Sequence, residues 1–166
     1  MSNIVRFLLM FSAFMVFLAC DKAQGPALNI SNDIYISVLD ESGGDLLDPN
    51  NPATVDLKQV KVYYDLNGVK TEINRSNLDF PQMFLVEEPG ENSDHHRILL
   101  FLNTEDNSDI TTTYFEWGPS QTDVFKSLIN RDGNGINDEK IWLNDELICD
   151  VAVKPGRCSV TVTMDE

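Results

Sequence analysis

The chain has 166 residues, and its 27 acidic residues against 12 basic ones give a net charge of −15 at neutral pH. A surface this acidic repels nucleic acid and anionic lipid headgroups, so nucleic acid is excluded as a partner. The hydrophobic content of 42% excludes wholesale disorder, and the length fits one domain with one core.

The first twenty residues have the layout of a secretory signal. Arg6 supplies a positive charge, and an apolar run from Phe7 to Ala19 follows, interrupted only by Ser12. A membrane-spanning helix needs about 20 apolar residues, whereas a secretory signal needs only about 7 to 15, so we expect this segment to be cleaved. An uncleaved signal anchor and a buried core helix are the alternatives.

The segment Phe17-Leu18-Ala19-Cys20 resembles the lipobox of bacterial lipoproteins, with Phe17 where that family more often has leucine. The resemblance implies that residues 1–19 are a signal peptide and that Cys20 carries a lipid. The whole chain resembles the small uncharacterised lipoproteins of Bacteroidota. That resemblance implies a Gram-negative cell envelope location, as an outer membrane lipoprotein that faces the periplasm or the cell surface.

Residues 20–32 are poor in large apolar side chains and contain Gly25 and Pro26, which predicts a flexible tether. From Asp33 a period of two begins, with Ile34, Ile36 and Val38 on one face, so we expect the folded domain to span 33–166. Residues 40–56 form a long loop. The strand that begins at Asp33 and the turn after it resemble the opening of transthyretin-like and carboxypeptidase-regulatory-like sandwich modules. The residues that carry this resemblance are Ile36 to Asp40, Gly44, Leu46 and Pro49.

A hairpin is predicted around Asn67-Gly68, a dipeptide that favours the type I′ turn. A two-residue loop fixes the register of its strands and predicts three cross-strand pairs: Leu66 with Val69, Asp65 with Lys70, and Val62 with Ile73.

Further short strands are expected along the rest of the chain, at 83–87, 97–103, 111–117, 124–129, 140–143, 146–153 and 158–164. A polar loop at 88–96 and a tight turn at Asn144-Asp145 separate some of them, and Pro119 ends another. The fold class is therefore all-β, an antiparallel β-sandwich of about eight to ten strands behind a cleaved apolar signal segment.

Two cysteines remain once Cys20 is assigned to a lipid. Cys149 and Cys158 are a candidate disulfide in an oxidising compartment. A hairpin around Pro155-Gly156 would place Val153 opposite Cys158 and displace Cys149 along its strand. A disulfide needs Cα atoms roughly 4.4 to 6.8 Å apart, so a bridge and two buried free thiols both stay open.

One run of polar residues resembles the short calcium loops of secreted repeat proteins. Its oxygen ligands would be Asn130, Asp132, Asn134 and Asp138. It departs from the EF-hand loop at Ile136 and Ile141. The alternative is a polar hairpin tip whose Asp-Gly and Asn-Gly pairs only supply turn geometry.

Catalytic motifs are missing from the sequence. His95 and His96 are adjacent, so on a strand they would point to opposite faces; a zinc site in a loop and a solvated acidic loop tip are the two interpretations. No pair of nucleophile and base can be proposed, and we expect no catalytic residues and no cofactor apart from calcium.

Six aromatic residues lie on expected strands, where they would either line a sugar-binding face or fill the core: Tyr63, Tyr64, Tyr114, Phe115, Trp117 and Trp142. We therefore expect a binding or structural accessory module, anchored to the membrane through Cys20, with a protein or glycan partner. The alternative is a metal-dependent or carboxylate-based hydrolase acting on a glycan or peptide.

Overall fold

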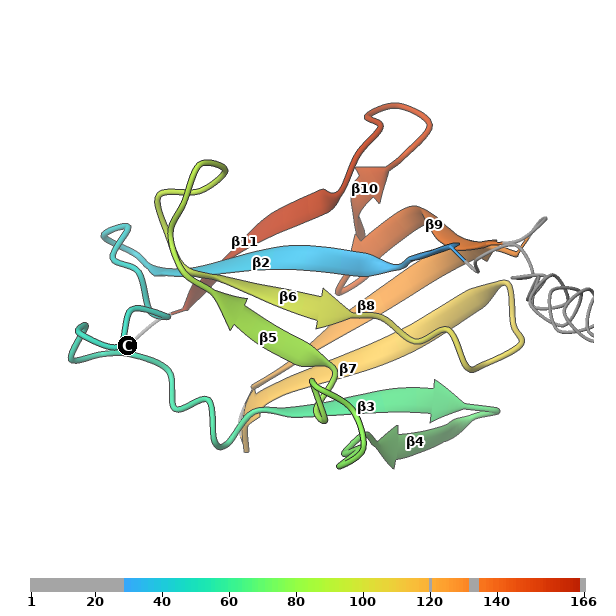
Figure 1. The fold of residues 1–166 in the computed structure, drawn as a ribbon, viewed down its shortest axis with the longest axis horizontal. Coiled ribbons are helices and arrows are strands. Elements are labelled where there is room, and N and C mark those ends of the chain that lie inside the picture. The colour runs from blue at the N-terminus through green and yellow to red at the C-terminus, as the bar shows by residue number, and fades with distance from the viewer. Residues whose placement is uncertain (1–28, 120, 132–134, 165–166) are drawn as a thin grey trace, which may run out of the picture.

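The computed structural model describes residues 29–119, 121–131 and 135–164, which form eleven strands in two facing sheets (Figure 1). The predicted all-β class is confirmed, and the arrangement is that of a β-sandwich. No helix in these ranges is long and apolar enough to cross a membrane. The strands are β1 (Asn29–Ser31), β2 (Asp33–Asp40), β3 (Lys61–Leu66), β4 (Val69–Glu72), β5 (Phe84–Glu87), β6 (Arg97–Phe101), β7 (Ile110–Gly118), β8 (Gln121–Asn130), β9 (Gly135–Leu143), β10 (Glu146–Asp150) and β11 (Cys158–Met164).

Sheet A has seven strands, six of them in the order β1-β9-β8-β7-β3-β4; the seventh, β10, pairs with the same edge of β9 as β1 does, farther along that strand. Sheet B has four strands in the order β11-β2-β6-β5. Most neighbours are antiparallel, but β1 runs parallel to β9 and β11 runs parallel to β2. The sheets are therefore mixed, which corrects the expectation of a purely antiparallel sandwich.

The core lies between the two sheets. Strand β2 buries Ile34, Ile36 and Val38 completely, as its period of two predicts, and β7 contributes the fully buried Phe115 from sheet A. The hydroxyl of Tyr64 donates to the Phe101 carbonyl 3.0 Å away, so one buried polar group links the sheets without remaining unsatisfied.

The hairpin at Asn67-Gly68 is confirmed. Both turn residues have positive φ, and the pairs Leu66–Val69 and Asp65–Lys70 form as expected. The Ile73 amide donates to the Val62 carbonyl at 2.9 Å, which extends the same register. The turn at Asn144-Asp145 is likewise confirmed, with positive φ at both residues between β9 and β10.

Among the described residues, strand structure is already present at Asn29–Ser31, before the expected domain start at Asp33. Residues 29–31 fall within the predicted tether but form β1 on the edge of sheet A, and residues 1–28 lie outside the described residues. The chain then crosses to sheet B at Asn32, which is buried. Its side-chain amide donates to the Leu102 carbonyl at 2.6 Å, and its own carbonyl accepts from the Leu102 amide at 2.9 Å.

The expected hairpin around Pro155-Gly156 is wrong. The chain leaves β10 in sheet A at Asp150, passes through the loop at the top of Figure 1, and enters sheet B as β11. Because the chain changes sheets here, Cys149 and Cys158 are not displaced along one ladder. They form a disulfide with Cα atoms 6.0 Å apart.

We expect loss of this disulfide in a Cys149→Ser, Cys158→Ser double variant to lower the free energy of unfolding by about 2 to 3 kcal/mol, because the unfolded chain gains loop entropy. Urea titrations with and without a thiol reductant measure this difference. The reductant should destabilise the unaltered protein and leave the double variant unchanged. Equal stability of the unaltered protein and the double variant in the absence of reductant would contradict the prediction.

Candidate functional site

Two clefts adjoin each other at the end of the sandwich where the chain passes from β10 in sheet A to β11 in sheet B. Their volumes are about 440 and 340 Å³, and both are lined by Asn137, Asp138 and Val151. The larger extends over β9 to Lys140 and Asp150, and the smaller reaches Asp33 and Arg157 in sheet B. We call the two together the crossover cleft.

A β-bulge turns Asp138 inward. The pairing of β8 with β9 shifts between Leu128, opposite Lys140, and Ile129, opposite Asp138, so Glu139 is the extra residue. A bulge re-aims side chains, and here it leaves both Asp138 and Ile141 buried on the inner face. The bulge thus places a carboxyl group on the inward face of sheet A, beside the buried Ser127.

Asp138 is the most perturbed acid of this region. It is 7% exposed, its Oδ1 accepts a hydrogen bond from the Ser127 hydroxyl, and its Oδ2 has no partner among the described residues. Burial raises the pKa of Asp138 to about 7, against the lowering effect of the Ser127 hydrogen bond and with a further increase from the negative charge of Asp33.

Asp33 lies on the sheet B side of the cleft. Its side chain is 9% exposed, and its Oδ1 is 2.8 Å from Nε of Arg157. Burial raises the pKa of Asp33, Arg157 opposes that shift, and Glu87 adds to it. Arg157 also donates to the Tyr35 hydroxyl at 2.9 Å, which holds the guanidinium beside the outward face of β2.

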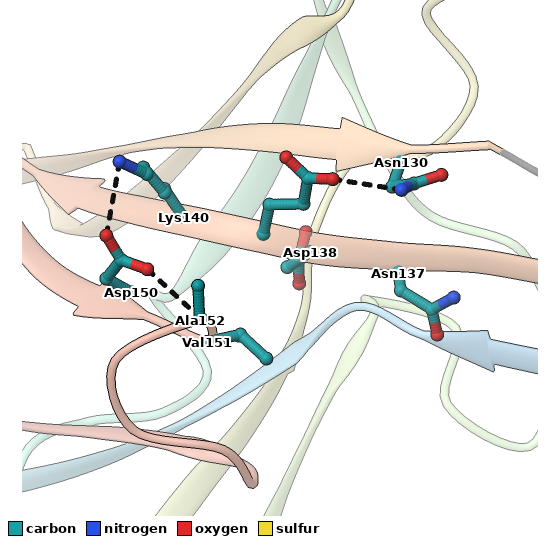
Figure 2. Close-up of a pocket in the computed structure, with 8 residues that line it drawn as sticks. Asn130, Asn137, Asp138, Lys140, Asp150, Val151 and Ala152 are labelled. Carbon is teal, nitrogen blue, oxygen red and sulfur yellow. Dashed lines mark hydrogen bonds and ion pairs between the residues drawn. The ribbon is translucent and has the colours of Figure 1, made fainter.

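Several charged and polar side chains in the wider part of the cleft are paired with one another (Figure 2). Nζ of Lys140 is 3.1 Å from Asp150, which also accepts from the Ala152 amide, and Asn130 donates to Glu139 at 2.9 Å. In Figure 2 the Lys140–Asp150 pair lies at one end and Asn130 with Asn137 at the other, with Asp138 between them.

The predicted calcium ligands are only partly described. Asp132 and Asn134 lie outside the described residues, Asn130 is the last residue of β8, and Asp138 lies within β9 rather than in a loop. Asn130 and Asp138 do line the same cleft. Among the residues that the structure describes, no group of three or more His, Cys, Asp or Glu side chains could hold a metal.

The histidine pair lies away from the crossover cleft. His95 and His96 belong to the loop between β5 and β6, as expected. Asp45 Oδ2 accepts from the His96 backbone amide and lies 2.8 Å from its Nδ1, which ties this loop to the one after β2. Neither histidine is among the residues that line the cleft, so histidine and cleft carboxylates do not share a site.

The aromatic residues divide by strand alternation. Tyr64, Phe115 and Trp117 are buried in the core, as the core interpretation predicts. Tyr63, Tyr114 and Trp142 are half-buried on the outward face of sheet A, and we call them the outer aromatic row. Tyr63 pairs directly with Tyr114, and Trp142 pairs with Lys126 of β8.

Sequence reasoning missed Asp33, Ser127 and Arg157 as site residues. One signal was available, because Ser127 occupies an inward position between the buried Phe125 and Ile129, where a polar residue requires a partner. Asp33 and Arg157 had no such signal, since their proximity depends on two segments that change sheets at the same end.

The raised pKa of Asp138 predicts a dependence of stability on pH. The folded protein holds this proton more tightly than the unfolded chain, whose carboxyl has the ordinary pKa of 3.8. The contribution is therefore fully favourable below pH 4 and is lost as pH rises toward 7, by about 1.4 kcal/mol per pH unit and about 4 kcal/mol in all.

The Asp138→Asn variant should lose this part of the pH dependence, measured by urea unfolding between pH 4 and 8. The matched control is Glu41→Gln, which removes an exposed acid and should keep the profile of the unaltered protein. If the stability of Asp138→Asn still falls with rising pH as that of the unaltered protein does, the pH dependence comes from another group.

Comparison with protein families, with curated proteins and with solved structures found no match, so the function is argued from the chain itself.

Proposed function

We propose that the protein is a lipid-anchored accessory module of a Gram-negative cell envelope, held through Cys20, that binds a glycan on the outward face of sheet A. The observation that carries the proposal is the outer aromatic row. Tyr63, Tyr114 and Trp142 come from three different strands of one sheet and remain half-exposed.

The distance from the anchor supports the same proposal. Residues 21–28 lie between Cys20 and β1, and a segment of this length spans at most about 28 Å when fully extended. The outer aromatic row lies away from that attachment. Ile30 of β1 pairs with Ile136 of β9, and Trp142 lies about 20 Å farther along β9. A lipid at Cys20 would leave this face free for a partner.

Side-chain chemistry around the rings favours a glycan over a protein surface. Lys70 lies over the rings of Tyr63 and Tyr114 at 4.5 and 4.9 Å from their centroids and pairs with Glu116. Thr112 pairs with Lys126 next to Trp142. Aromatic rings can stack on the apolar face of a sugar, and the charged and hydroxyl groups between them can hydrogen-bond to its hydroxyl groups. The core of a protein–protein interface, by contrast, is depleted in charged residues.

The crossover cleft gives less support to a hydrolase. General acid–base catalysis requires a carboxyl group within hydrogen-bond reach of the substrate. Asp138 has one oxygen bonded to Ser127 and the other buried, and Asp33 is ion-paired with Arg157. These two carboxyl groups are enclosed by the protein rather than presented to a large substrate, and the exposed Glu139 accepts a hydrogen bond from Asn130.

Glycan binding is tested with a glycan array and by titration against the best hit. Tyr114→Ala and Trp142→Ala should each weaken binding on the order of tenfold, which corresponds to about 1.4 kcal/mol for one stacked ring. The matched control is Tyr35→Ala, which removes a tyrosine from the outward face of sheet B and should leave affinity unchanged. No glycan binding, or equal losses in all three variants, would refute this use of sheet A.

Lipid attachment is tested separately in a Gram-negative host supplied with a labelled fatty acid. The unaltered chain should incorporate the label and fractionate with membranes. Cys20→Ala should do neither, because the thiol that carries the lipid is absent. A labelled Cys20→Ala protein would contradict the assignment of the anchor.

A further inference from the structure

Two buried carboxyl groups from different sheets line the narrower part of the crossover cleft. Asp138 belongs to β9 of sheet A and is 7% exposed, and Asp33 belongs to β2 of sheet B with a side chain that is 9% exposed. Each is more than nine-tenths buried, and the charge of Asp33 acts on Asp138. Two carboxyl groups enclosed at one sheet-to-sheet junction are compensated either by a proton or by a positive group, and when both are ionised a cation is required.

The positive charge on the described side chains is insufficient for both. Arg157 pairs with Asp33, but its side chain is 52% exposed and its remaining donor contact is to the Tyr35 hydroxyl. Lys140, the other basic residue that lines the cleft, pairs with Asp150. Asp138 Oδ2 is buried with no hydrogen-bond partner among the described residues, and a buried polar atom of this kind needs a partner, which a bound cation would supply.

Apart from Arg157, the polar side chains that line the narrower part of the cleft offer a cation only oxygen ligands. Besides the two carboxyl groups it is lined by Ser31 and Asn137, and its one sulfur-bearing residue, Cys158, is engaged in the disulfide. Oxygen ligands without imidazole or thiolate select hard cations such as calcium and magnesium over zinc. Calcium also accepts water and neutral oxygens to complete six to eight ligands, so two carboxylates are sufficient for weak binding.

We propose that the crossover cleft binds calcium between Asp33 and Asp138, so that the ion links sheet A to sheet B where the chain changes sheets. This site differs from the calcium loop expected from the sequence, with which it shares only Asp138. It is also independent of glycan binding on the outward face. Two carboxylates and a competing guanidinium place its dissociation constant in the range of weak extracellular sites, about 0.1 to 1 mM.

The test is thermal unfolding of the purified protein in 10 mM calcium chloride against the same buffer with chelator, supported by isothermal titration with calcium alone. A ligand that binds only the native state raises Tm, and at this concentration the shift should be roughly 5 °C. Asp138→Asn and Asp33→Asn should each abolish most of the shift. Asp132→Asn, in the loop expected from the sequence, should leave it intact.

The Arg157→Gln variant is a second test, in which the calcium-induced Tm shift should change in the opposite direction. It does not depend on whether the aspartate variants fold. It removes the cation that competes for Asp33, so calcium should bind more tightly and the Tm shift should increase. Circular dichroism confirms that each variant is folded before titration. The proposal is overturned if calcium produces no shift, if the shift survives in Asp33→Asn, or if Asp132→Asn alone abolishes it.

Discussion

The structure depends on where the chain passes from one sheet to the other. It does so five times, and two of these passages matter most here: the one at Asn32, between β1 and β2, and the one after Asp150, between β10 and β11. Because both passages occur at the same end of the sandwich, β2 and β11 start side by side and run parallel, with Cys158 opposite Ile34. The disulfide and the buried Asn32 amide hold this end closed. The shared position of these two passages thus accounts for the parallel pairing of β2 with β11 and for the position of the crossover cleft.

The same constraint explains why carboxyl groups are buried there. Where the chain leaves one sheet and enters the other, the regular alternation of inward apolar side chains is interrupted. The interior at that end is therefore not filled by apolar side chains from a continuous strand. Asn32, Ser127 and Asp138 occupy this end of the interior, where all three are buried, while the middle of the sandwich is filled by residues such as Ile36 and Phe115. Buried polar groups hold a structure in place only when each finds a partner. Asn32 and Ser127 do, and one oxygen of Asp138 does not.

Local chemistry could be predicted from the sequence, and long-range pairing could not. The turns at Asn67-Gly68 and Asn144-Asp145 were predictable because positive φ is a property of the two residues themselves. The inward face of β2 followed from its alternation. By contrast, nothing in the segment Asn29–Ser31 indicates a parallel partner at Gly135–Asn137, more than a hundred residues away. The hairpin expected at Pro155-Gly156 failed for the same reason, since turn residues do not specify which sheet the chain enters next.

The candidate sites show the same division. The outer aromatic row follows from alternation once the strands are known, because Tyr63 and Tyr64 must point to opposite faces, as must Tyr114 and Phe115. The pair of Asp33 and Asp138 requires three long-range facts: the crossing at Asn32, the bulge at Glu139 and the return of the chain through Arg157. An excess of acids over bases made almost any carboxylate pair conceivable, so composition could not select this one. Burial together with an unpartnered oxygen selects Asp138. Asp106 and Asp123 are also buried, but both oxygens of each accept hydrogen bonds, whereas Asp138 Oδ2 has no partner among the described residues.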